Sequence, residues 1–437
     1  MARVRQLTTA AHGHTIANRG CWSADGASIL YDLRDDETCF DGDAIERVIV
    51  ATGRVERLYR SAHGACCGVP TCSPCDDRYV FIHGDENPDE DWQYCAWHRR
   101  GALGAIGRPG FAEPLDARDI VAPYTAGALR GGTHLHTFNS AGTAILSTYE
   151  DHVLATSTDP LAQANRRTLA VTLLDHPVIV PQSHRRNHNG SGFTVCVAAL
   201  SESPRPGSDE IWMATGEAWV GNRSQIAFQA TVLGDDAQPR VELFLAELPA
   251  DLHDLMHAGT QPLEGTPQTR PGVPAGIRIR RLTDTSDHRF PGLAGPRHWA
   301  VSSPDGQSIG CYLRDDEGLV QFCTVSTDGG EPRTVTRGRF QPTSAFTWHP
   351  DGTQVTYVAD GSVVLVHLDS GRIERLTPRR PPDAGPTHHA CVFSPDGSMI
   401  AFMQPVQTAE GRFNQLHVVD CAKIPRALSD RIPEHIC

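Results

Sequence analysis

The chain has 437 residues, a formal net charge of −13 and a pI of about 5.9, which argues against nucleic acid or an anionic membrane as its main partner. The N-terminal segment MARVRQLTTAAHGHTIANRG lacks the apolar core of a signal peptide, and no stretch is apolar over the length of a membrane span. We therefore expect a soluble, cytoplasmic protein. Thirteen cysteines, scattered over a long chain, favour reduced thiols over a disulfide framework.

One phrase recurs along the chain: a short apolar alternation, a turn related to Ser-Pro-Asp-Gly, and a second apolar alternation. It begins at residues 21, 71, 136, 218, 300, 346 and 391, as CWSADGASILYDLRDD, TCSPCDDRYVFIHGDE, HTFNSAGTAILSTYEDH, AWVGNRSQIAFQATVLG, AVSSPDGQSIGCYLRDD, FTWHPDGTQVTYVADG and CVFSPDGSMIAFMQP. The copies at 71 and 136 are degenerate, and the copy at 218 lacks Pro-Asp-Gly. Alternation predicts strands, and Pro-Asp-Gly supplies the backbone angles of a hairpin turn.

A second phrase follows several copies, as GRVERLYR at 53–60, GEPRTVTR at 330–337 and GRIERLTP at 371–378. Each begins with a turn glycine and continues as an outer strand, so one unit holds two hairpins. We predict an all-β fold, a single β-propeller of seven four-stranded blades that spans residues 1–437. The N-terminal VRQLTT resembles the end of the second phrase, and we expect it to pair beside FNQLHVVD in the last blade and close the ring.

Three long insertions separate the copies, at about 85–130, 153–217 and 250–295. The second is rich in Pro, Arg and His, and the third in Pro and Gly. We interpret them as loops over one face of the ring rather than as separate domains. Long loops in compact proteins tend to be functional or mobile.

Histidines recur at one position of the repeat. The strand that enters the turn is expected to be the innermost strand of its blade, with its start near the mouth of the central channel. Seven residues before the turn position stand Asn18, Gly68, His134, His298, Ser344 and His389. His136 faces the same way as His134 on a regular strand. We therefore predict that His134, His136, His298 and His389 converge at the channel mouth, although a slip of one residue would turn any of them away.

Neutral imidazoles that converge from several strands suit Mn²⁺, Fe²⁺, Zn²⁺ or Ni²⁺; the alternative is that they simply line a wet channel. Arginines stand beside the same positions: Arg19, Arg130 and Arg297. A guanidinium is the natural partner of a carboxylate or sulfate. Tyr124, in the loop that leads to the His pair, is either an acid–base residue or a packed loop residue.

Other charged or thiol-rich stretches give weaker signals. The spacing of Cys67, Cys72 and Cys75 resembles an iron–sulfur motif, but Cys72 takes a buried strand position of the repeat and Cys75 falls in its turn. The acidic loop 85–91 lacks the EF-hand pattern and predicts a solvated loop. The basic stretches WHRRG and HRRNHNG either hold anionic sugars over the mouth or are ordinary surface.

The hairpin phrases resemble the TolB-type propeller repeat. YVFIHGDENPDEDWQY, APYTAGALRGGTHLHTF, GSDEIWMATGEAWVGN and PRHWAVSSPDG resemble the YidR-type family of bacterial propellers, a resemblance that runs almost from end to end. More distantly, the chain is similar to oligogalacturonate lyases, seven-bladed propellers that hold Mn²⁺ with a His-x-His pair and a histidine from another blade. His134, His136 and His298 match that set, but Gly131 stands where the lyases have a glutamine.

This resemblance implies a metal-dependent enzyme, with Mn²⁺ as first candidate, that acts on a small acidic carbohydrate. The most concrete expectation is a lyase that cleaves a uronate-type oligosaccharide by β-elimination. In it, a His or Tyr base takes the C5 proton, and Arg130 or Arg297 stabilises the resulting charge. The alternative is a non-catalytic TolB-like propeller that binds a protein or a glycan. The oligomeric state is left open.

Overall fold

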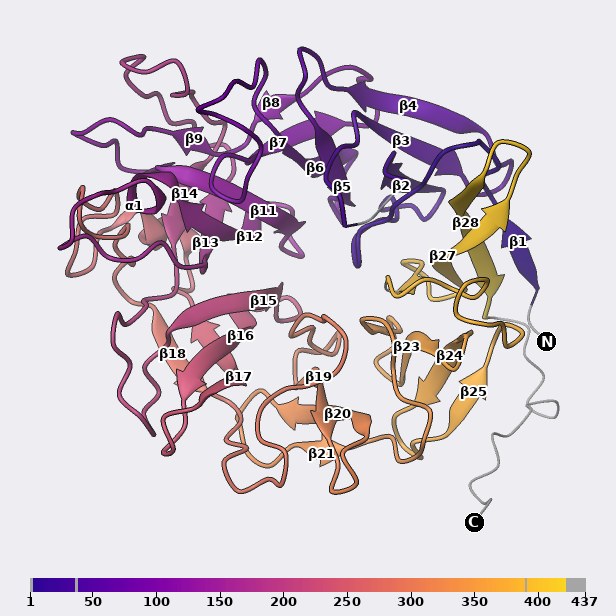
Figure 1. Ribbon diagram of the computed structural model, residues 1–437. Helices are drawn as coiled ribbons and strands as arrows, with labels where there is room; N and C mark the ends of the chain where they lie inside the picture. Colours follow the sequence, from indigo (N-terminus) through magenta and orange to yellow (C-terminus); the bar gives the residue numbers. More distant parts are fainter. Residues whose placement is uncertain (1–2, 36–37, 390, 422–437) are drawn as a thin grey trace.

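The computed structural model describes residues 3–35, 38–389 and 391–421. Seven β-sheets stand around a central axis as the blades of a propeller (Figure 1). Blade 1 contains β2 (Ser28–Asp32), β3 (Ala44–Ile49) and β4 (Val55–Arg60), and blade 2 contains β5 (Cys67–Cys72), β6 (Arg78–His83), β7 (Arg100–Ala105) and β8 (Glu113–Pro114). Blade 3 contains β11 (Gly131–Phe138), β12 (Ala144–Asp151), β13 (Thr168–Leu173) and β14 (Phe193–Cys196).

The chain continues around the ring in the same order. Blade 4 contains β15 (Met213–Trp219), β16 (Gln225–Leu233), β17 (Pro239–Glu247) and β18 (Arg278–Arg281), and blade 5 contains β19 (Ser308–Arg314), β20 (Val320–Ser326) and β21 (Arg333–Thr334). Blade 6 contains β22 (Thr347–Trp348), β23 (Gln354–Ala359), β24 (Ser362–His367) and β25 (Ile373–Arg375), and blade 7 contains β26 (Val392–Phe393), β27 (Met399–Gln407), β28 (Arg412–Asp420) and β1 (Val4–Gln6). The predicted all-β, seven-bladed propeller is confirmed.

Blades 1 and 5 differ slightly from the predicted four-stranded pattern. Their sheets have three strands, and the innermost segment joins each sheet through single bridges, Trp22 to Ile29 and Ser302 to Ile309. The ring closes as predicted. In blade 7, β1 pairs antiparallel with β28, with Val4 opposite Val419.

The recurring turn has the chemistry that its sequence indicates. In blade 5, the Ser303 hydroxyl donates to the Asp305 carboxylate at 2.5 Å, and the same carboxylate oxygen accepts the N–H of Gln307 at 3.0 Å. Gly306 follows with a φ of 68°, a conformation that glycine adopts at little cost. The turn is therefore held by local bonds within each copy.

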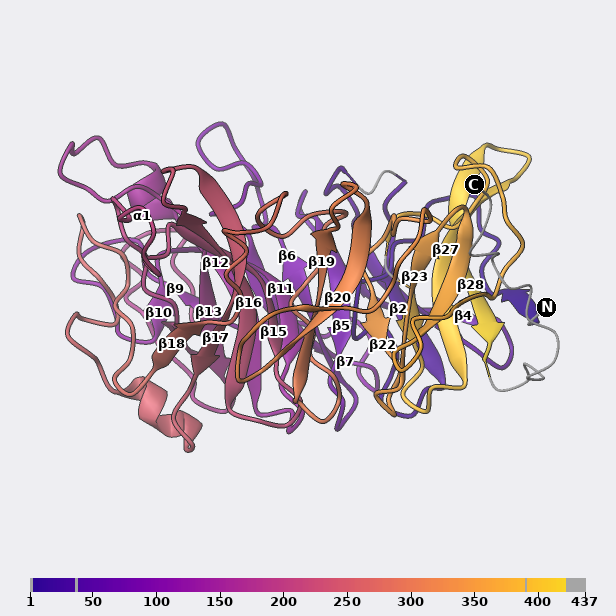
Figure 2. The same cartoon turned by 90° about the horizontal axis from the view of Figure 1, so that it is seen from below.

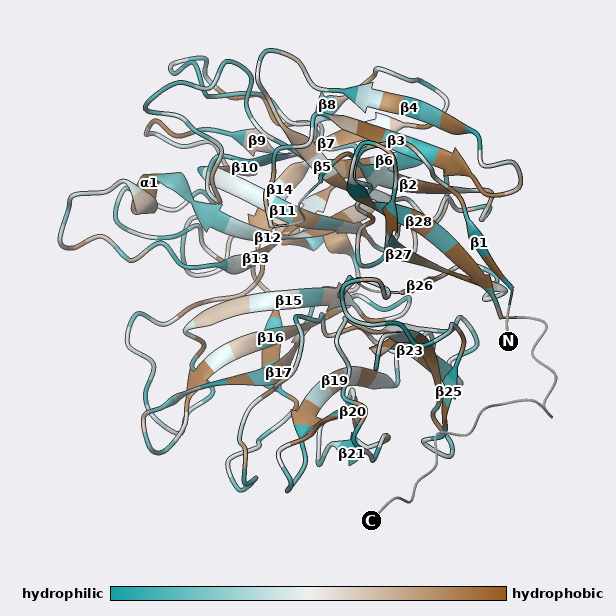
Figure 3. Ribbon diagram, turned by 45° about the vertical axis from the view of Figure 1, so that its right-hand side comes forward, coloured by the Kyte–Doolittle hydropathy of each residue, from teal (hydrophilic) through white to brown (hydrophobic). Residues whose placement is uncertain are grey.

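Apolar strand faces pack between neighbouring blades, and most of the strongly hydrophobic colour in Figure 3 lies on strands, whereas the outer loops are largely polar. In three blades, a tryptophan three residues before the turn forms a hydrogen bond to the neighbouring blade. The indole N–H groups of Trp22, Trp219 and Trp348 donate to the main-chain carbonyls of Val392, Thr137 and Val301, each at 3.0 Å. Each carbonyl belongs to the preceding blade, so these bonds join blades in pairs.

The three predicted insertions contain both loops and outer strands. The first includes β7 and β8 with the short pair β9 (Ala117–Arg118) and β10 (Ala128–Leu129), the second includes β13, β14 and α1 (His152–Ala155), and the third includes η1 (Leu252–Met256) and β18. Their connections leave from both faces of the ring, with α1 and the short helix η1 on opposite sides in Figure 2.

Two further observations concern the described residues. Within the described ranges, no helix is long and apolar enough to cross a membrane. The twelve cysteines of those ranges are all free thiols, as the odd and scattered pattern predicted.

Candidate functional site

Three neighbouring inner strands carry a β-bulge at the same register. The bulges lie between Gly68 and Thr71 in β5, between His134 and Thr137 in β11, and between Thr215 and Ala218 in β15. Each contains a residue of positive φ: Val69 (56°), Leu135 (58°) and Gly216 (64°). A bulge adds a residue and re-aims the side chains around it. The alternation assumed for the His-x-His pair is therefore broken between its two histidines.

The side chains that line the channel stand six residues before the turn, one residue later than predicted. Leu135 of blade 3, Trp299 of blade 5 and Ala345 of blade 6 hold this position and share one apolar cluster, which also contains Trp22 of blade 1, three residues before its own turn. Blades that are not neighbours in the ring can meet only at its axis, so this cluster marks the channel. The offset turns His298 away from the axis and into the protein.

His298 uses both ring nitrogens within the protein. Its Nδ1 lies 2.9 Å from the carbonyl oxygen of Pro296, and its Nε2 accepts a hydrogen bond of 3.4 Å from the main-chain N–H of Tyr312. Burial lowers the pKa of His298 to about 4, so the ring is neutral and Nδ1 carries the proton. Neither nitrogen is open to a metal in this arrangement.

His136 points between blades 2 and 3. Its Nε2 lies 2.9 Å from the hydroxyl of Thr133, which donates to Asp116 at 3.0 Å. The ring also fills the space above Gly101 on β7, where a Cβ would come within 2.8 Å of Nε2. Burial, reinforced by the charge of Arg99, lowers the pKa of His136 to about 3.

The four predicted metal ligands do not converge. His136 faces blade 2, His298 is bonded at both nitrogens, and His389 lies beside His388 with 5.5 Å between the ring centroids. Across residues 3–35, 38–389 and 391–421, no three or more His, Cys, Asp or Glu side chains are grouped so as to hold a metal ion. The residues present therefore do not fit the predicted Mn²⁺ site, nor Zn²⁺, Fe²⁺ or Ni²⁺ in its place.

Arg130 and Tyr124 have a structural role outside the channel. Arg130 is fully buried and forms an ion pair of 2.5 Å with Asp151, and it also donates to the carbonyl groups of Thr266 and Thr269. The ring of Tyr124 stacks 4.8 Å from the Arg130 guanidinium. Because these groups already have protein partners, the geometry does not support the catalytic roles predicted for them.

The channel mouth instead gathers other charged side chains, which we call the arginine cluster: Arg19, Arg99, Arg167, Arg297, Glu150 and Glu217. Arg19, on blade 1, crosses the channel and donates to the main-chain carbonyl of Glu217 on blade 4 at 2.5 Å. Its guanidinium lies 5.9 Å from the ring of Trp299. Burial lowers the pKa of Arg19 to about 10, and the charge of Glu217 opposes this shift.

Glu150 holds two members of the cluster. One of its carboxylate oxygens, Oε2, lies 3.3 Å from Arg99 and 3.1 Å from Arg167. His134 lies within the field of these arginines. Its own burial, followed by the charges of Arg99, Arg167 and Arg297, holds the pKa of His134 well below its ordinary value, so the imidazole is neutral. Its Nδ1 is buried and has no hydrogen-bond partner in the part of the chain that the structure describes.

Arg297 is the exposed member of the cluster. Its guanidinium stacks 5.2 Å from the ring of Trp299, and no described residue forms an ion pair with it. Partial burial, followed by the charge of Arg167, lowers the pKa of Arg297, while Glu217 opposes the shift. Four guanidinium groups against two carboxylates leave two excess positive charges here, in a chain whose net charge is −13.

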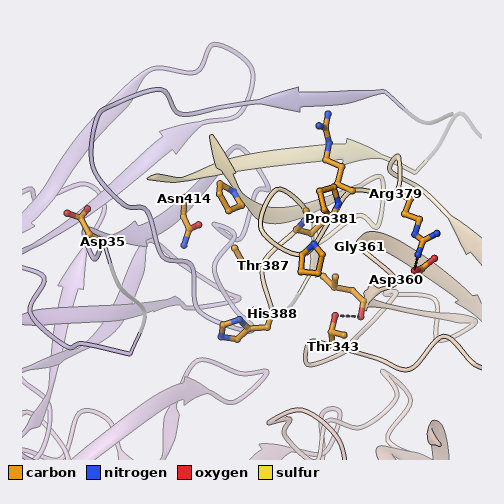
Figure 4. A pocket seen from close by; sticks show the side chains of 15 residues that line it. Asp35, Thr343, Asp360, Gly361, Arg379, Pro381, Thr387, His388 and Asn414 are labelled. Atoms are coloured by element: carbon orange, nitrogen blue, oxygen red, sulfur yellow. Dashed lines mark hydrogen bonds and ion pairs between the residues drawn. The ribbon is translucent and has the colours of Figure 1, made fainter. Parts of the chain in front are cut away.

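A cavity of about 1080 Å³ opens on the same face, between the loops of blades 6, 7 and 1. Figure 4 shows Asn414, Thr387 and His388 around its open space. Arg379, at its wall, is paired with Asp360 at 2.9 Å. The cavity thus extends the mouth away from the arginine cluster and offers mainly polar and proline surfaces.

The acidic loop 85–91 forms ion pairs with the basic stretch HRRNHNG. Asp89, in the acidic loop, accepts from Arg185 at 2.6 Å and from Arg186 at 2.9 Å. Both arginines of the stretch HRRNHNG are therefore already paired with one acidic side chain, whose charge opposes the binding of an anionic sugar. The stretch WHRRG contributes Arg99 to the cluster.

Sequence reasoning singled out Arg297 and Arg19 but missed three members of the cluster: Glu150, Arg167 and Glu217. Glu150 lies on β12 and Arg167 immediately before β13, so neither stands on the inner strand where the repeat places its channel residues. For Glu217 a signal exists, because it stands five residues before the turn position of its copy, the place that His136 takes in the preceding copy.

Comparisons with known proteins identify a family model and a relative that covers most of the chain. A family model described as "Protein of unknown function (DUF3748)" matches residues 66–188. The uncharacterized protein YidR of Escherichia coli (strain K12) is 42% identical over 402 residues, which cover 92% of this chain and 95% of that protein.

Solved structures share the fold at low identity. An oligogalacturonate lyase in complex with manganese matches with a TM-score of 0.58 and 12% identity, covering 96% of this chain and 93% of the lyase. An oligogalacturonate lyase from Vibrio parahaemolyticus matches with a TM-score of 0.54 and 11% identity, covering 97% and 94%. With its end-to-end match to YidR and its seven-bladed ring, this chain belongs to the YidR family of β-propeller proteins.

Proposed function

We propose that the channel mouth binds a carbohydrate that carries a carboxylate, of the uronate type, and acts on it by β-elimination. The observation that carries this proposal is the arginine cluster, in which exposed Arg297 has no acidic partner among the described residues. Guanidinium groups bind carboxylates through two parallel hydrogen bonds. Two excess positive charges at this mouth, in a protein of net negative charge, favour an anionic ligand there.

The cluster also suits the charge that β-elimination creates. When the proton leaves the carbon next to the carboxylate, negative charge grows on the carboxylate oxygens, and fixed guanidinium groups stabilise it. His134 is the base that we assign, because its imidazole is neutral and lies in the field of the same arginines. A bound carboxylate offsets the charges of Arg99, Arg167 and Arg297, so binding raises the pKa of His134 toward the range where it accepts a proton well.

The experiment compares the wild-type protein with Arg297→Gln, using galacturonate oligomers as the probe. We expect calorimetry to show binding to the wild type and a loss of about tenfold or more in Arg297→Gln, because a charge-assisted bond to the carboxylate is removed. Arg54→Gln is the matched control, since Arg54 is exposed and pairs only with Glu56 among the described residues. It is expected to bind like the wild type.

Turnover is followed by the ultraviolet absorbance of an unsaturated uronate product. Binding with product formation that is lost in His134→Ala supports the lyase. Binding without product leaves a non-catalytic glycan-binding propeller, the alternative of our sequence analysis. If no acidic carbohydrate binds to the wild type, the proposal is wrong in both forms.

A further inference from the structure

Glu217 is an incompletely bonded carboxylate inside the arginine cluster. The residue is fully buried. Its Oε1 accepts a hydrogen bond of 2.6 Å from the hydroxyl of Thr148 on β12. Its Oε2 is also buried, and in the described ranges it has no hydrogen-bond partner. An ionised carboxylate offers about four acceptor sites, so most of its bonding capacity is unused.

The surroundings of Glu217 are charged but do not satisfy this oxygen. Arg19 bonds to the main-chain carbonyl of Glu217 rather than to its carboxylate. Arg297 lies within its electrostatic reach and forms no ion pair with it. A buried acceptor without a donor destabilises the folded protein, and more so when it is charged. Such an atom inside a proposed binding site is an observation that points to a ligand with a donor group.

We propose that Glu217 Oε2 accepts a hydrogen bond from a hydroxyl group of the bound ligand. This inference rests on the proposed function, in which the arginine cluster binds the carboxylate of the same ligand. Because Oε2 is buried, a neighbouring side chain must move to admit the ligand. Arg297 is free to do so, since its side chain is exposed, stacks on Trp299 and has no ion-pair partner among the described residues. The site then selects hydroxy acids, and Glu217 determines that specificity.

The chemistry excludes ligands that present only acceptors. Sulfate satisfies the arginines but has no hydrogen to give to Oε2, and it brings further negative charge toward a buried carboxylate. A uronate presents its carboxylate to the arginines and a neighbouring hydroxyl to Glu217. A site built to bond a hydroxyl group rejects a ligand that leaves its buried acceptor unpaired far more strongly than an apolar pocket rejects a change of one methylene.

The test measures the affinities of galacturonate and sulfate by calorimetry in the wild type, in Glu217→Gln and in the control Glu202→Gln. Glu202 pairs with Arg270 and Arg166 and, among the described residues, with no member of the cluster. In Glu217→Gln the amide oxygen can keep the bond from Thr148 while the amide nitrogen presents a donor in place of Oε2. We expect the preference for galacturonate over sulfate to fall by about tenfold or more, mainly because sulfate binds better, and to stay unchanged in Glu202→Gln.

The outcomes separate this inference from the proposed function. If galacturonate binds to the wild type but Glu217→Gln leaves the preference unchanged, the inference is overturned and the arginine site stands. If the wild type binds no carboxylate at all, both fall. Should Glu217→Gln fail to fold, the wild type alone decides: cyclohexanecarboxylate, a ring acid without hydroxyl groups, is expected to bind at least about tenfold more weakly than galacturonate, and equal affinities overturn the inference.

Discussion

A single hydroxyl, that of Thr148, supplies the hydrogen bond that the Glu217 carboxylate receives from a described residue. Thr148→Val keeps the shape of the side chain and removes this donor, which leaves a buried carboxylate with two unbonded oxygens. We expect the free energy of unfolding, measured by urea denaturation, to fall by about 1–3 kcal/mol. The buried Thr356, whose hydroxyl donates to the neutral carbonyl of Val364 at 2.8 Å, is the matched control. An equal or larger loss in Thr356→Val would show that the charge of Glu217 is not what makes the Thr148 bond important.

At the scale of single strands, the bulge in β15 sets the direction of Glu217. Gly216 holds a φ of 64°, and a Cβ at this position would meet the Gln229 side chain at 2.8 Å, which donates to the carbonyl of His298 at 3.0 Å. Gly216→Ala is therefore expected to cost about 1–3 kcal/mol of stability and to weaken galacturonate binding in calorimetry. Gly110 has a φ of 83° and open space around it, so Gly110→Ala isolates the backbone cost. Binding that is unchanged in Gly216→Ala would separate the bulge from the site.

The same strands show what could be predicted from the sequence. The propeller was predictable because each Asp-Gly turn carries its own local signal, such as Asp305 with Gly306. The directions of His134 and His136 could not be predicted. Leu135, which stands between them, has a positive φ, and leucine as a residue type gives no indication of that conformation. Val69 is a stronger case, since β-branched residues rarely adopt such a φ. Of the three residues with a positive φ in these bulges, only Gly216 is of a type that indicates a bulge.

At the scale of the whole molecule, ring closure creates the site. Arg19 and Glu217 are 198 residues apart in the chain, yet they bond across the channel because blades 1 and 4 stand on opposite sides of it. The cluster joins residues of blades 1 to 5, and no local pattern relates them. The composition indicates an acidic protein, but the fold gathers arginines from several blades at one mouth of the channel. This is why Arg19 and Arg297 were singled out from the sequence, whereas Glu150, Arg167 and Glu217 were not.

The buried histidines make the stability of the folded ring depend on pH. Burial lowers the pKa of His14 and of His298 to about 4 from an ordinary value of 6.5, and that of His136 to about 3. Between about pH 6.5 and 4 the unfolded chain therefore binds more protons than the folded one, so stability is full above this window and falls as the pH drops through it.

Urea denaturation at a series of pH values measures this loss. Each of these histidines contributes up to about 1.4 kcal/mol per pH unit, and His298→Gln is expected to be less stable than the wild type near neutral pH but to have a shallower slope in the acid window. His253→Gln is the control, because His253 is exposed and bonded only to Asp251 among the described residues, and its slope should match that of the wild type. A wild-type stability that stays constant down to about pH 4.5 would contradict the prediction, since it would mean that the folded ring takes up protons as readily as the unfolded chain.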